Sequence, residues 1–209
     1  MGRWDEVVLK GRALRLETLG MQHADGLVAA SAIDPSLYRW SAVPVGREAV
    51  ENYIATATEL REAGKALAFA AVREPDGLVI GAARFFDIEQ WAWPAAHRQH
   101  ARANPDVCEI GYTWFSAPSI RTAANTETKL LMLTHAFEAW GMLRVCFHTD
   151  ARNDRSAAAL ARIGARFEGI LRTHRLAVDC AVRDSKRYSI VADEWPEVKK
   201  NLLAKLDRG

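Results

Sequence analysis

The spacing of apolar residues along the chain predicts short strands and amphipathic helices in mixed order. The segment Leu14-Arg15-Leu16-Glu17 alternates between apolar and polar residues, as a half-buried strand does. Other segments repeat their apolar residues every three or four positions, and Gly64, Gly141 and Gly164 end three of these helices. The patterns predict strands at 14–17, 66–73, 78–87, 107–115, 143–149, 166–174 and 181–191, and helices at 25–32, 47–63, 125–140, 153–163 and 194–206.

The turn sequences indicate how these elements connect. Pro75-Asp76-Gly77 and Val178-Asp179-Cys180 each separate two predicted strands and therefore predict hairpins. Between the hairpins, strands alternate with helices, which favours an α/β (α+β) fold with a mixed sheet and helices on its faces. No linker or repeat divides the chain, so we expect residues 1–209 to form a single domain. The long irregular segment 90–106 is of the kind that often carries function.

Composition and targeting signals predict a cytoplasmic globular protein. Hydrophobic residues make up 49% and charged residues 26% of the chain, which is enough to form a core without disulfides or a structural metal. No apolar run approaches the roughly 18 residues of a membrane span, and the first residues lack the apolar region of a secretory signal. Cys108, Cys146 and Cys180 are odd in number and widely spaced, which argues against a disulfide framework and a zinc site.

The positive charge of the chain is concentrated in one segment. Residues 144–187 contain 10 Lys and Arg against 5 Asp and Glu, whereas residues 1–120 contain 12 against 15. A local basic segment favours an anion site over general nucleic-acid binding, which usually requires a domain-wide basic surface. The alternative, equally compatible with charge alone, is a solvated face of an arginine-rich protein.

A junction between a strand and a helix is the first candidate site. Glu109-Ile110-Gly111-Tyr112-Thr113-Trp114-Phe115 reads as a strand, and Arg121 to Glu127 enter the next helix. Such a junction presents unpaired backbone N–H groups and the positive end of the helix dipole, which favours anion binding. The alternative is that Asn125 or Thr126 only caps the helix.

Several short motifs follow one another in an order that resembles one family. They are Glu109-Ile110-Gly111-Tyr112, the junction at 121–127, Asn153-Asp154-Arg155-Ser156, Ile163-Gly164-Ala165, Glu168-Gly169-Ile170-Leu171-Arg172, Arg183-Asp184, Tyr188-Ser189-Ile190 and Glu194-Trp195. Their spacing, from about Leu9 to Lys200, resembles the GNAT acetyltransferases, in particular the branch of the ribosomal-protein alanine and serine N-acetyltransferases. The resemblance implies a GNAT-like fold, a mixed and mostly antiparallel sheet splayed at its centre with helices on both faces.

The resemblance also implies a cradle for acetyl-CoA, the co-substrate, at residues 121–126. The family pattern there is Q/R-x-x-G-x-G/A, whereas this chain has no glycine in that stretch. Glycine normally allows a close approach of the backbone to pyrophosphate, and alanine is its mildest substitute. The hydroxyl of Thr126 or the guanidinium of Arg121 could add phosphate contacts. The implied cofactor-binding residues are Trp114, Phe115, Arg121, Thr122, Ala123, Ala124, Asn125, Thr126 and Asn153.

Two residues are candidates for acid and base catalysis. By resemblance, Asn153 holds the pantetheine arm and Ser156 donates a proton to the departing thiolate, although both could serve only to cap a helix. The tyrosine that many GNAT enzymes use one turn later is absent, since Leu160-Ala161-Arg162 occupy that region. Glu109 is the candidate general base, and His148 and His174 are the alternatives.

The acceptor side is predicted from aromatic residues. Trp40, Trp91 and Trp93 could stack on the acceptor, or they could close the core under the long loop. His174 is a further candidate for binding the acceptor. His97 and His100 lack a third ligand at metal-site spacing, so we expect no metal.

These inferences together predict an acetyl-CoA-dependent N-acetyltransferase. The expected acceptor is a primary amine, either a small molecule or a protein N-terminus, which attacks the thioester directly. The chain also lacks the sequence signatures of nucleotide hydrolysis, dinucleotide binding and serine hydrolysis. The alternative function is a non-catalytic acyl-CoA-binding or ribosome-associated module. The resemblance allows a homodimer, and we expect no membrane partner and find no strong nucleic-acid signal.

Overall fold

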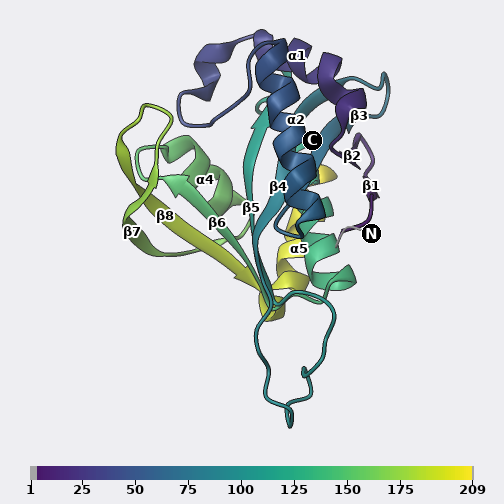
Figure 1. Ribbon diagram of the computed structural model, residues 1–209, viewed down its shortest axis with the longest axis vertical. Coiled ribbons are helices and arrows are strands. Elements are labelled where there is room, and N and C mark those ends of the chain that lie inside the picture. Colours follow the sequence, from purple (N-terminus) through teal and green to yellow (C-terminus); the bar gives the residue numbers. More distant parts are fainter. Residues whose placement is uncertain (1–3, 209) are drawn as a thin grey trace.

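The computed structural model describes residues 4–208, which contain one eight-stranded sheet in the order β1-β2-β3-β4-β5-β6-β8-β7 (Figure 1). Neighbouring strands are antiparallel except β5 and β6, which are parallel. The strands are β1 Val8–Lys10, β2 Leu14–Thr18, β3 Leu67–Arg73, β4 Val79–Glu89, β5 Val107–Phe115, β6 Arg144–Asp150, β7 Arg166–Leu176 and β8 Val182–Val191.

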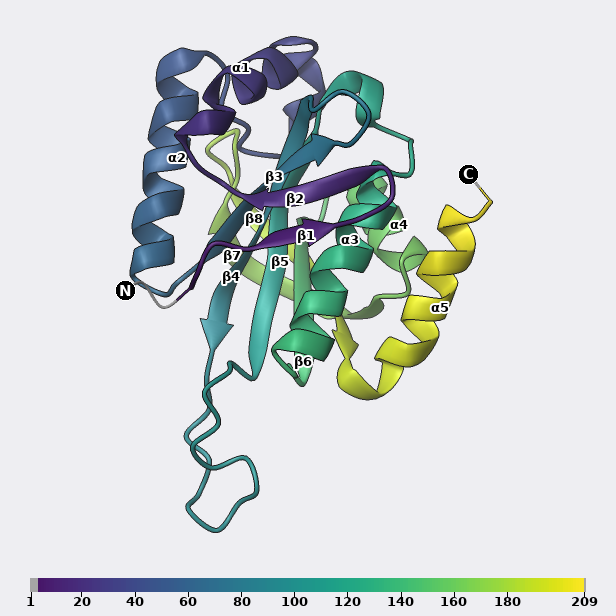
Figure 2. The same ribbon diagram turned by 90° about the vertical axis from the view of Figure 1, so that its right-hand side faces the viewer.

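Helices cover both faces of the sheet (Figure 2). The helices are α1 Ala24–Ala32, α2 Arg47–Glu62, α3 Ala124–Thr134, α4 Asp154–Arg162 and α5 Trp195–Leu206, and a π-helical turn at His135–Ala139 continues α3. Short 3₁₀ turns lie at η1 Met21–His23, η2 Pro35–Tyr38, η3 Ala117–Ser119 and η5 Ala192–Glu194. The expected mixed sheet with helices on both faces is therefore confirmed, whereas β1 and the four short turns were not predicted.

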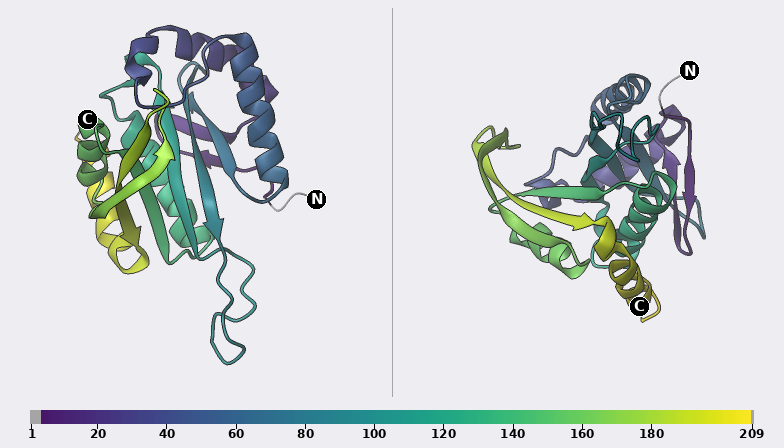
Figure 3. Two further views of the ribbon diagram at one scale, coloured as in Figure 1. Left: turned by 60° about the vertical axis from the view of Figure 1, so that its left-hand side comes forward. Right: turned by 90° about the horizontal axis from the view of Figure 1, so that it is seen from below.

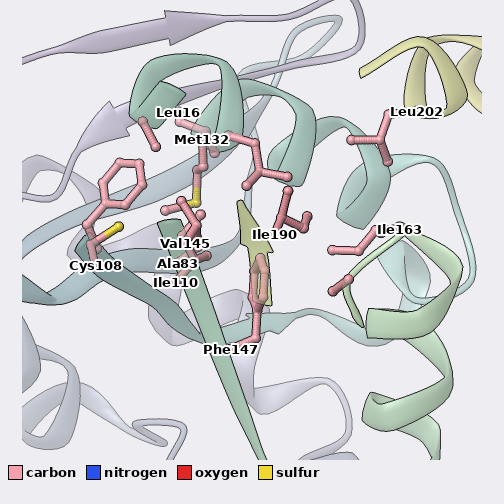
Figure 4. Packing of buried hydrophobic residues seen from close by; sticks show 14 of the residues in the cluster. Leu16, Ala83, Cys108, Ile110, Met132, Val145, Phe147, Ile163, Ile190 and Leu202 are labelled. Atoms are coloured by element: carbon pink, nitrogen blue, oxygen red, sulfur yellow. The ribbon is translucent and has the colours of Figure 1, made fainter. Parts of the chain in front are cut away.

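Two hydrophobic clusters hold the layers together. The larger one joins the sheet to α3, α4 and α5 through residues such as Leu160. Met132 of α3 and Leu202 of α5 are labelled in Figure 4. The smaller one, on the opposite face, contains Leu27 of α1 and Ile54 of α2. Because side chains alternate between the two faces of a strand, the central strands β3, β4 and β5 contribute residues to both clusters.

The sheet opens between its two parallel strands. β5 and β6 pair only over Val107, Cys108 and Glu109, although both strands continue beyond these residues. Seen from below in Figure 3, β6, β8 and β7 curve away from the block formed by β1 to β5. The backbone edge of β5 beyond Glu109 is therefore free of a partner strand, as the expected central splay requires.

A bulge in β5 accompanies this opening. Ala82 of β4 pairs with Trp114 and Arg84 pairs with Gly111, so β5 has one residue more than β4 between these pairs. Tyr112, within the bulge, has a left-handed φ of 48°. On β4, a Cβ added to Gly81 would lie 2.1 Å from the carbonyl oxygen of Trp114, so only glycine allows this approach of the strands.

The long segment between β4 and β5 extends from the lower end of the sheet, away from the helices (Figure 1). Its base is fixed by Asp106, whose carboxylate accepts hydrogen bonds from Trp91 N (2.7 Å) and Trp93 Nε1 (3.0 Å). Arg102 Nη2 donates to the carbonyl oxygens of Trp140 and Gly141, both at 2.9 Å. Among residues 4–208, no helix has the length and apolar content that a bilayer span requires.

Candidate active site

A cavity of about 590 Å³ occupies the opening between β5 and β6. Its walls come from both faces of the sheet. Phe147, Leu160 and Ile163 belong to the cluster on the α3 face, and Tyr38, which packs against the α1–α2 cluster, lies on the other face. The cavity therefore connects the two faces through the sheet, so two reactants can approach each other from opposite sides.

The turn before α3 supplies backbone donors at one end of this cavity. The first hydrogen bond of the helix runs from Glu127 N to Ala123 O (2.9 Å), and the N–H groups of Asn125 and Thr126 have no backbone partner in the described chain. The Thr122 hydroxyl accepts a hydrogen bond from Ala124 N (3.2 Å). Neither Asn125 nor Thr126 caps the helix, since both lie inside it, so the capping alternative for these two residues is wrong.

The glycine-free turn obtains its left-handed residue from Arg121. Its φ is 64°, whereas Ala123 has an ordinary φ of −65°. Arg121 and Asn125 line the cavity, as do Trp114 and Phe115 at the end of β5. Four predicted residues of the cradle shape the turn without lining the cavity. They are Thr122, Ala123, Ala124 and Thr126.

The start of α4 forms another wall. The Asn153 side chain caps the helix by accepting a hydrogen bond from Ser156 N (3.1 Å), as the capping alternative requires of Asn153. Both residues line the cavity. The Ser156 hydroxyl forms no hydrogen bond within the described residues, which leaves it available for a ligand.

Glu109 lies at the point where β5 and β6 separate, and its side chain is buried. Its Oε2 is 2.9 Å from Arg175 Nη2 and 2.8 Å from His148 Nδ1. Arg175 also contacts Asp87 Oδ2 at 2.8 Å. Burial raises the pKa of Asp87, because desolvation disfavours its charged form.

The two histidine candidates differ in whether they line the cavity. The rings of His148 and His174 are 4.8 Å apart, but only His148 lines the cavity. Desolvation lowers the pKa of His174, which favours its neutral form. His174 therefore lies beside the ring of His148 but is not part of the cavity wall.

Of the three tryptophans predicted for the acceptor side, the structure brings one to the cavity. Trp40 lines it, with the guanidinium carbons of Arg39 and Arg152 at 4.8 and 4.4 Å from its ring centroid. Trp91 and Trp93 lie on the long β4–β5 segment and do not line the cavity, so the structure does not bring them to the predicted acceptor site. Among the residues described, no group of three or more His, Cys, Asp or Glu is placed to hold a metal ion.

A buried lysine in the cavity wall was not predicted. Lys129 of α3 donates a hydrogen bond to Thr113 Oγ1 (2.8 Å), and its Nζ lies 5.7 Å from the Phe147 ring centroid. Burial lowers its pKa from 10.5 to about 7. Helical spacing could have revealed it, since Lys129 precedes the buried residues Met132 and Leu133 by three and four positions.

The basic segment 144–187 is largely neutralised by ion pairs. Six of its ten Lys and Arg side chains contact a carboxylate, and Arg155, Arg162, Arg172 and Arg183 do not. Arg155 and Arg162 are exposed on α4 beside the cavity, Arg172 is exposed outside it, and Arg183 is partly buried in its wall. The anion site expected from the charge pattern is thus restricted to a few residues.

Comparisons with known proteins agree with this geometry. Residues 13–166 match the acetyltransferase (GNAT) domain. A GCN5-related N-acetyltransferase from Brucella melitensis is 28% identical, with a TM-score of 0.82 over 97% of this chain and 86% of that chain. A protein from T. thermophilus assigned as an acetyltransferase is 33% identical, with a TM-score of 0.76 over 97% and 99% of the two chains.

One structure with a bound ligand is also similar in fold. The Mycobacterium smegmatis protein RimJ, in complex with CoA-disulfide, is 22% identical, with a TM-score of 0.71 over 96% of this chain and 92% of that chain. A search of curated proteins finds no match to this chain.

Proposed function

The chain belongs to the GNAT acetyltransferase family, and from this premise we propose that it transfers the acetyl group of acetyl-CoA to the primary amine of a small molecule or a protein N-terminus. The observation that carries the proposal is the cavity through the sheet, which has backbone donors at one end and the carboxylate of Glu109 in its wall. The two ends suit the two reactants, an anionic carrier and an amine.

The residues around the turn before α3 fit a coenzyme A diphosphate. Asn125, whose N–H has no backbone partner within residues 4–208, and Arg121 both line the cavity and would supply a donor and positive charge, as anion sites at helix N-termini do. The N–H of Thr126, the next residue of α3, is also without a backbone partner in the described chain. Arg155 and Arg162 on α4 add two cations beside the same cavity. Arg121 provides the left-handed turn, so the lack of glycine does not prevent this backbone shape.

The open edge of β5 fits the amide-containing arm of the carrier. Its backbone groups beyond Glu109 have no partner strand, and an extended ligand can pair with such an edge as an added strand does. Asn153, Trp114 and Phe115 line the same part of the cavity. When bound here, acetyl-CoA supplies the activated acetyl group.

Glu109 is proposed to accept the proton of the amine, directly or through water. Its contact with Arg175 holds the carboxylate in a fixed orientation at the place where the strands separate. The Ser156 hydroxyl is proposed to donate a proton to the thiolate that leaves, and a backbone N–H near Trp114 to stabilise the developing oxyanion. Positioning of the two reactants can supply about 7–11 kcal/mol of the rate acceleration.

An assay of CoA release tests this proposal against the alternative of a non-catalytic acyl-CoA-binding module. With acetyl-CoA and a panel of amines, we expect sustained release that requires an amine. The variant Glu109→Gln should lower kcat/KM by about 10²- to 10⁴-fold, the usual contribution of a general base. The exposed Glu62→Gln variant on α2 is the matched control. Binding of acetyl-CoA in calorimetry without any amine-dependent release would instead support the binding module.

A further inference from the structure

Arg183 is the basic residue of segment 144–187 that is partly buried and yet has no acidic partner. No carboxylate oxygen of the described residues lies within 4.0 Å of a guanidinium nitrogen of Arg183, so it forms no ion pair. The Nε of Arg183 is buried without a hydrogen-bond partner in this part of the chain. Desolvation lowers the pKa of Arg183. A buried guanidinium donor without an acceptor is costly, so a ligand that supplies one gains binding energy there.

The alternation of side chains along β8 places Arg183 on the face of the sheet opposite α3. Side chains alternate along β8, and Tyr188 and Ile190 belong to the cluster on the α3 face. Arg183, an odd-numbered position, therefore lies on the opposite face. It pairs in register with Arg175, which contacts Glu109, and both arginines line the cavity.

A second arginine without a carboxylate partner among residues 4–208, Arg84, lies outside the cavity wall but contacts Tyr112, which lines it. Arg84 pairs with Gly111 across β4 and β5, and its guanidinium carbon is 3.6 Å from the Tyr112 ring centroid. Its Nε is also buried without a hydrogen-bond partner in the described chain. Arg175, in turn, has its guanidinium carbon 5.3 Å from the ring centroid of Phe86, whose ring lies 4.9 Å from that of Tyr112.

From this arrangement we propose that the amine acceptor carries an anionic group, a carboxylate or a phosphate, which Arg183 binds in the cavity wall beside Arg175 and Glu109. This inference rests on the proposed acetyl transfer and narrows its acceptor. Arg175 is already paired with the carboxylates of Glu109 and Asp87, so Arg183 is the arginine of this pair that has no carboxylate partner of its own within the described residues. A guanidinium binds both oxyanions with paired hydrogen bonds. Polycationic amines should be poor acceptors.

Matched pairs of acceptors test the proposal and distinguish the two oxyanions. One arm compares an α-amino acid with its amide, and the other compares phosphoethanolamine with ethanolamine. We expect kcat/KM to be higher for the anionic member of at least one pair by about 10- to 100-fold. This factor corresponds to the usual free-energy contribution of a hydrogen bond to a charged group. Arg183→Gln should remove this preference by raising KM for the anionic acceptor alone, and Arg183→Lys should restore part of it.

The control variant is Arg172→Gln on β7, which is exposed and outside the cavity, and it should leave the preference unchanged. Calorimetry with the N-acetylated anionic product on the free protein provides a readout that does not depend on turnover. Equal kcat/KM for the members of both pairs overturns the proposal. It is also overturned if Arg183→Gln raises KM for acetyl-CoA instead. If no amine is acetylated, the proposed acetyl transfer to amines is wrong, and calorimetry alone then tests the anion site. Absence of product binding in calorimetry refutes the anion site.

Discussion

Replacement of the buried Lys129 by methionine should stabilise the protein, and more at low pH than at high pH. Folding places the ammonium in the cavity wall with Thr113 as its hydrogen-bond acceptor, and burial lowers its pKa from 10.5 to about 7. Each pKa unit corresponds to about 1.4 kcal/mol, so the shift represents a penalty of about 5 kcal/mol for the charged form.

The direction of the pH dependence follows from proton binding. Below pH 7, the folded and unfolded states both carry the proton on Lys129, and the full penalty opposes folding. Between pH 7 and 10.5 the unfolded state binds more protons, so the free energy of unfolding rises with pH by about 1.4 kcal/mol per unit. Lys129→Met removes this dependence and loses one hydrogen bond, worth about 1 kcal/mol.

Urea unfolding of both proteins at pH 6, 7.5 and 9 measures the effect. We expect Lys129→Met to be more stable by several kcal/mol at pH 6, with a gain that decreases toward pH 9. The exposed Lys65→Met variant is the matched control and should show no such trend. The reasoning is refuted if the difference in free energy of unfolding between Lys129→Met and the unmodified protein stays constant from pH 6 to 9.

Three further changes test other parts of the structure. Gly81→Ala should lower the free energy of unfolding in urea by about 3 kcal/mol, because the added Cβ would clash with the Trp114 carbonyl oxygen. An unchanged urea midpoint would contradict the close approach of Gly81 to that carbonyl. Glu127→Ala should cost about 2 kcal/mol in the same assay, since the carboxylate accepts hydrogen bonds from Arg12 N and Ala13 N; Glu62→Ala is the control. Ser156→Ala should lower kcat and preserve acetyl-CoA affinity in calorimetry, whereas lost affinity would assign Ser156 a structural role.

The elements with regular hydrophobic spacing could be predicted from the sequence, and the others could not. The strand at Val107–Phe115 has the bounds expected from its apolar run. β1, three residues long, carries too few positions to show a period, and the turn at Pro35–Tyr38 has no hydrophobic repeat. Local patterns thus predicted the bounds of the main helices and strands to within a few residues.

The candidate site was predictable where it depends on local sequence. Asn153 caps α4 as its position suggested, and the turn before α3 has free backbone donors. Glu109 on β5 and Arg175 on β7 are 66 positions apart in the sequence, and their contact depends on the register of the strands, which the sequence does not show. The direction of the long β4–β5 segment is also a tertiary property, so the distance of Trp91 and Trp93 from the cavity could not be foreseen.

The short pairing of β5 with β6 has a mechanical consequence. In the described chain, these three residue pairs are the strand contact that joins β1–β5 to β6, β8 and β7. A ligand that fills the gap adds contacts to both blocks and binds the folded state alone, so occupancy and cohesion of the two blocks are thermodynamically linked. Ligand loading should therefore slow amide hydrogen exchange in β6, including at residues that do not contact the ligand.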